Sequence, residues 1–212
     1  MILLKNKELN SMKYLLHLTV AILFLTSLAP DTLAVIDPEP DTIGIYFDQN
    51  ADSGGSFVGA NIPFTAYVIL TNPTEFEIWG FEFGYEIITS GDPSAFFRLS
   101  TELPPQSIDL GDSSEILSGD YVVGMAIPLP STAAVTLVQW TFLMTTNMFV
   151  SLEMTPSRIP SLPGDLPAYE VGGTIVPLRI GGGCFNGVAQ VNESCPLASE
   201  TQSFGNVKAL YR

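Results

Sequence analysis

The stretch Trp79–Ile87 alternates strictly between large apolar side chains and small or acidic ones. One parity carries Trp79, Phe81, Phe83, Tyr85 and Ile87, and the other carries Gly80, Glu82, Gly84 and Glu86. Successive side chains of a β-strand point to opposite faces, whereas a helix would scatter these aromatic rings around its circumference. The pattern therefore predicts a strand with one packed face and one solvated face.

The same two-residue period begins at Ile43 and predicts roughly seven to nine strands separated by turn-forming residues. We expect strands at 43–47, 63–71, 79–87, 96–99, 121–127, 135–144, 148–154 and 174–180. The turn 145–147 would join the strands before and after it as a hairpin, and Pro177 would place the last strand at a sheet edge. The prediction is an all-β fold, a two-sheet antiparallel β-sandwich of jelly-roll or Greek-key topology with about eight or nine strands.

The first 34 residues have the layout of a secretory signal peptide. Lys13 supplies the positive start, 14–28 is a largely apolar run, and 32–34 is a small-residue cleavage site, so we place the cut between Ala34 and Val35. The apolar run is shorter than the ~20 residues that a helix needs to span a bilayer. We therefore expect a secreted protein, extracellular, at the cell surface or in the periplasm, with no membrane insertion after removal of the signal.

Four segments follow from these patterns: the signal peptide 1–34, an extended leader 35–42, a sandwich domain 43–181 and a C-terminal tail 182–212. The tail contains Cys184 and Cys195, which are expected to form a disulfide in an oxidising compartment. Asn192-Glu193-Ser194 matches a glycosylation sequon, which we interpret as a chance match. The last residues, 204–212, are apolar and basic, and would either dock on the domain or act as a sorting or attachment signal.

The charge balance restricts the partners. The whole chain has a formal net charge of −14. The predicted signal peptide 1–34 holds three of its eight Lys and Arg residues and two of its 22 Asp and Glu residues. The remainder, with five cations against twenty carboxylates, repels phosphate backbones and anionic lipid. We therefore expect an extracellular protein or polysaccharide as partner, and no nucleic acid.

The chain has one histidine, His17, which lies inside the predicted signal peptide. Ser-His-Asp and Cys-His catalysis, and metal sites that use histidine, are therefore excluded for the mature chain. Paired carboxylates could still hydrolyse a glycoside, but Glu82 and Glu86 lie about 13 Å apart by strand rise, beyond the ~5–9.5 Å that such acids need. Both are interpreted as part of a solvated face, and the protein is expected not to be an enzyme.

No cofactor is expected, although calcium stays open. Asp48, Asn50 and Asp52 resemble the start of a calcium loop, but Ser53 occupies the glycine position and Gly59 the place of the final glutamate. Asp and Asn also form ordinary turns, which is the alternative interpretation. A second acidic segment could contribute oxygens too: Asp109, Asp112, Glu115 and Asp120.

Aromatic side chains could instead face a ligand, since flat rings cover the apolar faces of sugars. The stripe from Trp79 to Tyr85 is interpreted mainly as core. Trp79, at the end of its strand, is the expected exception, together with Tyr46 and Tyr67, which have the opposite parity to the apolar faces of their strands.

The order of these elements resembles the cohesin-like and carbohydrate-binding-module-like sandwiches of secreted bacterial proteins. The similar segments are Gly59–Leu70, Asn72-Pro73, Trp79–Phe83 with Tyr85, Val135–Phe142 and Gly172–Val176. The resemblance implies a sandwich that works by binding. In cohesins this tyrosine is usually followed by Asp-Pro, whereas Tyr85 is followed by Glu86-Ile87, so dockerin binding is not implied.

Together these patterns predict a secreted, non-catalytic β-sandwich that acts as a protein-interaction or cell-envelope structural module. Two alternatives stay open: a carbohydrate-binding module and a carboxylate-based glycoside hydrolase.

Overall fold

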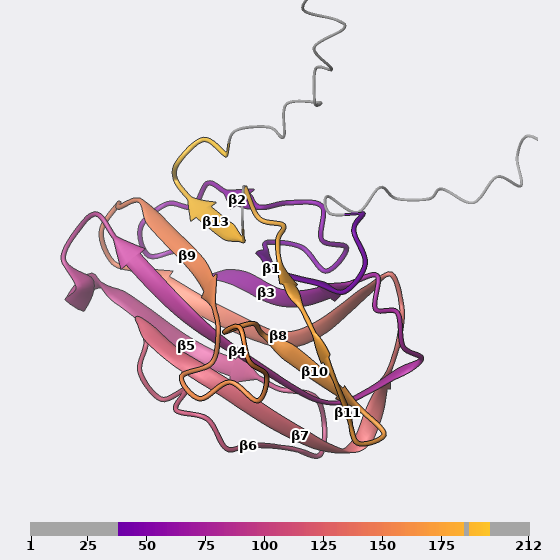
Figure 1. Cartoon of the computed structure of the whole chain (residues 1–212). Helices are drawn as coiled ribbons and strands as arrows, with labels where there is room; N and C mark the ends of the chain where they lie inside the picture. The colour runs from indigo at the N-terminus through magenta and orange to yellow at the C-terminus, as the bar shows by residue number, and fades with distance from the viewer. Residues whose placement is uncertain (1–37, 185–186, 196–212) are drawn as a thin grey trace, which may run out of the picture. The chain divides into compact units, whose positions relative to one another are not determined.

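The computed structural model describes residues 38–184 and 187–195. Within these residues the fold is all-β, and two sheets face each other (Figure 1), with the main apolar core between them. The one helical turn among them is the 3-10 helix η1 (Pro93–Ala95), capped by the Asp92 side chain. No helix in the described part of the chain is long and apolar enough to cross a membrane.

The first sheet has the order β12-β1-β3-β8-β5. Its strands are β1 (Thr42–Tyr46), β3 (Phe64–Thr71), β5 (Phe96–Glu102), β8 (Ala134–Met144) and β12 (Arg179–Ile180). The second sheet has the order β11-β10-β4-β9-β13-β2, and β7 pairs with both β4 and β6. Its strands are β2 (Gly55–Ser56), β4 (Glu77–Thr89), β6 (Ser107–Asp109), β7 (Ser118–Pro130), β9 (Val150–Thr155), β10 (Ala168–Val171), β11 (Thr174–Pro177) and β13 (Val188–Val191).

The predicted two-sheet β-sandwich is confirmed. All pairings among the described strands are antiparallel except two short parallel ones, β1 with β12 and β2 with β13. The described residues hold thirteen strands rather than eight or nine, because several two- to four-residue strands carry no detectable period in the sequence.

The alternating stretch forms the centre of the second sheet. Phe81, Phe83, Tyr85 and Ile87 of β4 are buried in the core, as predicted. The ring of Tyr85 packs against the fully buried Trp140 of β8 (centroids 5.2 Å apart), whose Nε1 donates a hydrogen bond of 2.8 Å to the hydroxyl of Tyr121 on β7. Each fully buried aromatic or aliphatic side chain contributes roughly 1.5–3 kcal/mol to folding, so this cluster is the main source of stability.

Two predicted connections are wrong. The segment after β8 does not fold back as a hairpin: β9 belongs to the second sheet and pairs with β4 and β13. The predicted last strand, 174–180, is divided between the sheets, because β11 pairs with β10 while β12 pairs with β1. Leu178, between the two, is buried where the chain crosses from one sheet to the other.

The predicted segment boundaries also need correction. Residues 188–191 of the predicted tail 182–212 form β13 inside the second sheet, so the sandwich continues past residue 181. Thr42, assigned to the extended leader, already belongs to β1, and the residues before it form a turn that Asp41 fastens to Thr74 and Tyr169. The signal peptide, its cleavage site at Ala34 and Val35, and the segment 204–212 lie outside the described residues and stay predictions.

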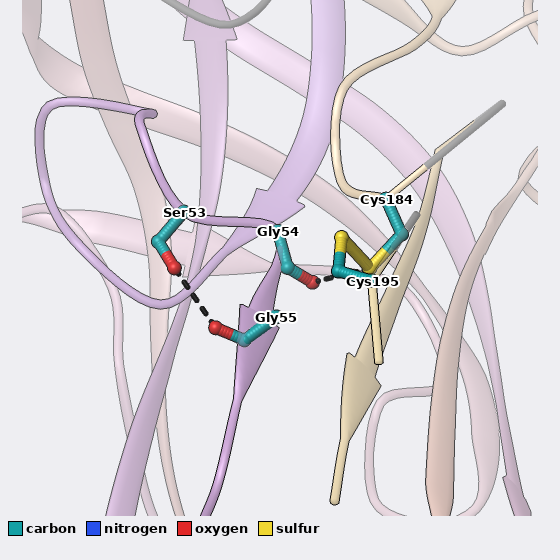
Figure 2. Close-up of a disulfide and its surroundings, with 5 residues drawn as sticks. All are labelled: Ser53, Gly54, Gly55, Cys184 and Cys195. Carbon is teal, nitrogen blue, oxygen red and sulfur yellow. Dashed lines mark hydrogen bonds between the residues drawn. A yellow bond between two sulfur atoms is a disulfide. The ribbon is translucent and has the colours of Figure 1, made fainter. Parts of the chain in front are cut away.

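Cys184 and Cys195 form the predicted disulfide (Figure 2). The bridge lies against the turn before β2, where Cys184 Sγ is 3.1 Å from the carbonyl oxygen of Gly54. A Cβ atom on Gly54 would lie 2.0 Å from the backbone of Gly183, so only glycine allows this approach. The disulfide therefore holds the end of the described chain against an N-terminal loop.

Candidate functional site

The first calcium candidate forms an ordinary turn. Asp48 Oδ1 accepts hydrogen bonds from the backbone N–H groups of Asn50 (2.8 Å) and Asp52 (3.1 Å), the arrangement of an Asx turn. Within the described ranges no three His, Cys, Asp or Glu side chains are grouped so that they could hold a metal ion. The local geometry thus fits the alternative interpretation as a turn, and calcium binding stays a prediction.

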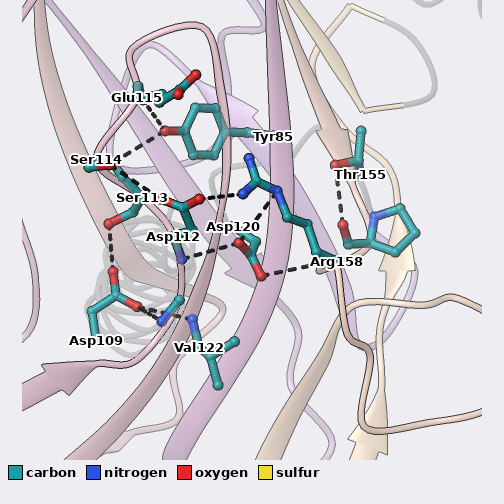
Figure 3. A network of polar contacts seen from close by, with 12 residues as sticks. Tyr85, Asp109, Asp112, Ser113, Ser114, Glu115, Asp120, Val122, Thr155 and Arg158 are labelled. Carbon is teal, nitrogen blue, oxygen red and sulfur yellow. Dashed lines mark hydrogen bonds and ion pairs between the residues drawn. The ribbon is translucent and has the colours of Figure 1, made fainter.

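The second acidic segment is organised by an arginine rather than left open for a cation (Figure 3). Arg158 pairs with Asp112, and its Nε lies 3.9 Å from Asp120 Oδ1. Asp109 accepts hydrogen bonds from the N–H groups of Gly111 (2.9 Å) and Val122 (3.1 Å). The hydrogen bond to Asp112 raises the pKa of Arg158 above its ordinary value. These contacts assign the acidic loop a structural role.

A second arginine joins the two sheets. Arg98 of β5 donates from Nη1 to the hydroxyl of Tyr85 on β4 (2.9 Å), and its other nitrogen donates to the carbonyl oxygen of Ser113. Burial raises the pKa of Tyr85, and the Arg98 charge partly opposes that shift. This pair therefore links β5 of the first sheet to β4 of the second.

The two carboxylates predicted to share a solvated face, Glu82 and Glu86, differ in their exposure to solvent. Glu86 is exposed, as expected, but Glu82 is only 6% exposed, so its assignment to the solvated face is wrong. Its two oxygens accept hydrogen bonds of 2.7 Å each from the N–H and hydroxyl of Ser161. Ser161 belongs to the loop 156–167, which covers this part of β4.

The three candidate aromatics have different positions. Tyr46 is fully buried with Ala51 and Ile69 in a small second cluster, so the prediction that it faces a ligand is wrong. The loop after β1 folds over its ring, which strand parity alone does not reveal. Tyr67 is half-buried beside this cluster. Trp79 is half-buried on the outer face of the second sheet, and its role in binding stays a prediction.

A β-bulge explains the position of Trp79. The register between β4 and β7 shifts between Ile78 and Gly80, and Ile78 is fully buried. The indole Nε1 of Trp79 donates a hydrogen bond of 2.8 Å to Glu77, two residues away on the same face. The bulge changes the parity of the strand, so that Trp79 leaves the core while Phe81 remains in it.

Trp79 lines a pocket of about 290 Å³ on the outer face of the second sheet. Gly80 of β4 and Gly124 of β7 are paired across the floor of this pocket. Its walls include Leu110, after β6, and Ile175 of β11; these side chains are 79% and 39% exposed. Gly124, Leu110 and Ile175 thus join Trp79 from segments that are distant from β4 in sequence.

Two carboxylates also line this pocket, Glu82 of β4 and Glu170 of β10. In the pairing of these strands Glu82 lies opposite Ala168, and Glu170 lies opposite Gly80, so the two acids are diagonal neighbours. Glu170 Oε1 accepts a hydrogen bond from the N–H of Gly173 in the β10–β11 turn. The pocket thus combines apolar walls, a floor without side chains and two acids.

Sequence reasoning identified Trp79 but missed Leu110, Glu170 and Ile175. Glu170 and Ile175 lie on a hairpin whose Gly172-Gly173 turn is visible in the sequence, but nothing local assigns it to β4. Leu110 and Ile108 are apolar residues at the start of the acidic loop, and that contrast was the available signal.

The sequon asparagine is used in the fold. Asn192 Oδ1 accepts from the N–H of Val58 (2.7 Å), and its Nδ2 donates to the carbonyl oxygen of Met148 (3.0 Å). These bonds occupy the nitrogen that a glycan would modify.

Comparison with known proteins identifies the fold and no more. No family model and no curated protein matches the chain. The sixth cohesin of scaffoldin B from Acetivibrio cellulolyticus, solved with a mutant dockerin, has a TM-score of 0.50 at 10% identity, covering 74% of this chain and 100% of that one. A non-cellulosomal cohesin from Archaeoglobus fulgidus has a TM-score of 0.46 at 11% identity, covering 73% and 93%. A type I cohesin from Pseudobacteroides cellulosolvens has a TM-score of 0.45 at 14% identity, covering 75% and 96%.

The fold is thus a cohesin-like β-sandwich, and the resemblance predicted from the sequence is confirmed for the fold.

Proposed function

We propose that this protein is a secreted, non-catalytic module that binds another protein through the outer face of its second sheet. The observation that carries the proposal is the pocket around Trp79, with its exposed apolar wall. Leu110 and Ile108, two residues apart at β6, are 79% and 67% exposed, so apolar side chains extend from the pocket onto the surface. Apolar surface of this kind, next to a concave site, is typical of an interaction surface.

The likeness to cohesins supports a protein partner, because one of the similar structures was solved in complex with a dockerin. We do not extend this to a dockerin partner for this chain, since Glu86-Ile87 follows Tyr85. Export is supported by the disulfide, because such bonds persist in oxidising compartments.

A non-catalytic role is supported by the contacts of the two acids in the pocket. Diagonal neighbours in a sheet lie about 7–8 Å apart, close enough for two carboxyl groups to reach the separation of a glycosidase pair. Both oxygens of Glu82, however, contact Ser161 under the loop 156–167, and Glu170 fastens its own turn. These contacts favour a structural use of both carboxylates.

The test compares capture of partner proteins by three forms of the mature chain. The immobilised protein is exposed to the extracellular fraction of the producing organism, alongside a Leu110→Asp/Ile175→Asp variant and a Phe76→Asp control. Phe76 is 90% exposed and does not line the pocket, so its replacement adds charge without changing the site. We expect the same protein to be retained by the wild type and the control and lost from the pocket variant. Equal retention by all three forms would contradict the proposal.

A carbohydrate-binding module is the second candidate, favoured by Trp79, whose ring lines a pocket while Trp140 is fully buried. Affinity electrophoresis in gels that contain soluble polysaccharides distinguishes it. Retardation that Trp79→Ala abolishes would favour this candidate, and release of reducing sugar that Glu82→Gln or Glu170→Gln abolishes would identify a hydrolase instead.

A further inference from the structure

We propose that the pocket around Trp79 receives a lysine or arginine side chain presented by the partner protein. This inference rests on the proposed function and extends it, since it assigns the chemistry by which the partner is recognised.

The shape of the pocket suits a long, thin side chain. Gly80 and Gly124 leave its floor without side chains, and a Cβ atom placed on Gly124 would meet no other atom within 4 Å. The open space above Gly124 therefore belongs to the pocket. An unbranched chain of methylene groups can lie along this floor, where a branched or globular group would find less room.

The walls suit the stem of such a side chain. Leu110 and Ile175 offer apolar surface from opposite sides of β4, and the methylene groups of lysine and arginine readily cover such surface. The indole of Trp79 is the aromatic ring that attracts cations most strongly. Its edge is fixed by the hydrogen bond from Nε1 to Glu77, so the ring is held ready for a ligand.

The charges suit the head of the side chain. Glu82 and Glu170 line the pocket, and each carboxylate keeps acceptor capacity beyond the hydrogen bonds described above. The described ranges contain three arginines and no lysine. Arg98 contacts Tyr85, Arg158 pairs with Asp112, and Arg179 pairs with Glu39.

No cation in the described part of the chain therefore neutralises the acids of the pocket. An anionic ligand would be repelled by them. A neutral sugar could donate hydroxyl hydrogen bonds to them but would leave their charge uncompensated, whereas an ammonium or guanidinium group would neutralise it. Charge complementarity thus selects a basic side chain as occupant.

The test uses the two indole N–H resonances of the isotopically labelled mature protein, which contains two tryptophans. The probes are n-butylammonium and n-butylguanidinium, which reproduce the two basic side chains, with n-butanol as neutral control and cellobiose as sugar. We expect both cations to shift the Trp79 resonance saturably, with weak affinity, and to leave the buried Trp140 resonance in place. Added salt should weaken the effect, because Glu170 is only half-buried.

Three variants make the test specific. Glu170→Gln keeps an oxygen for the N–H of Gly173 and removes one charge, so we expect binding about two- to fivefold weaker. Gly124→Val fills the floor and should abolish binding while the protein stays folded, because its Cβ enters open space. Glu86→Gln is the matched control: Glu86 lies on β4, as Trp79 and Glu82 do, but outside the pocket, so this variant should leave binding unchanged.

An equal response to butanol, a response to cellobiose alone, or no response of Trp79 to either cation would overturn the inference. Such a result leaves the proposed function standing if the Leu110→Asp/Ile175→Asp variant still loses its partner. If the cations bind but that variant retains every captured protein, the proposed function fails instead.

Discussion

The guanidinium of Arg98 donates a hydrogen bond of 2.9 Å to the hydroxyl of Tyr85, although the two residues belong to different sheets of the sandwich. The same guanidinium contacts the carbonyl oxygen of Ser113 in the acidic loop. One cation thus joins the first sheet, the second sheet and the loop between β6 and β7.

Replacing this arginine should therefore destabilise the protein more than replacing an exposed one. We expect Arg98→Met to lower the free energy of unfolding by about 2 kcal/mol, because it leaves partly buried acceptors without their charged donor. Arg179→Met, which removes an exposed ion pair with Glu39, should change it by less than about 1 kcal/mol. Urea denaturation of the two variants measures the difference, and equal effects would contradict this role for Arg98.

The stability of the protein should decrease at alkaline pH. Burial raises the pKa of both Tyr85 and Tyr169 above 10.0, their unfolded value. Their contribution is therefore fully present below pH 10 and is lost as pH rises through the higher pKa of the folded state. Unfolding free energies measured across this range should fall with pH, and a Tyr85→Phe/Tyr169→Phe variant should show a shallower fall. A pH dependence that the double variant retains in full would assign the effect to other groups.

Reduction of the disulfide should destabilise the sandwich without abolishing its fold. Closing a loop of this length contributes roughly 3 kcal/mol in the chain-entropy model, and the main apolar cluster does not depend on the bridge. We expect a reductant to lower the melting temperature of the wild type and to leave a Cys184→Ala/Cys195→Ala variant unaffected. Complete unfolding on reduction would show that the core alone is insufficient.

Glu82 should hold the loop 156–167 closed against β4. Glu82→Ala removes the acceptor of two hydrogen bonds from Ser161, so we expect the loop to open more often. Arg158 at its start makes the loop a trypsin site, and mass spectrometry of limited digests should show faster cleavage after this residue in the variant. Glu86→Ala, at an exposed position on the same strand, should leave the cleavage rate unchanged.

Calcium should leave the melting temperature unchanged. Asp48 already holds the backbone of its turn, and Arg158 already pairs with the acidic loop. Differential scanning calorimetry with calcium and with a chelator measures this. An upward shift with calcium that Asp48→Asn removes would restore the calcium-loop interpretation.

The strands that the sequence predicted well are those that pack one face against the apolar core. In β8 burial follows the alternation of apolar and polar residues closely, and in β4 the apolar parity from Phe81 to Ile87 is buried as predicted, although Glu82 on the other parity is buried too. The connections were harder, because a three-residue turn such as 145–147 is compatible both with a hairpin and with a crossing between sheets. Pairing partners far apart in the chain decide between them, and no local pattern contains that information.

The site was predictable only where it coincides with a strand end. Trp79 stood out because the aromatic stripe begins there, but the bulge that turns it outward depends on β7. The burial of Glu82 depends on a proline-rich loop without periodicity. Glu170 and Ile175 reach the pocket through a hairpin whose position is set by its pairing with β4.

The parallel pairing of β1 with β12 joins residues 42–43 to residues 179–180. The first strand thus obtains its second neighbour only when nearly the whole domain is available, so completion of the first sheet is a late event during biosynthesis. Long-range pairings of this kind slow folding, and under the export proposed above this delay keeps the chain unfolded for longer before translocation.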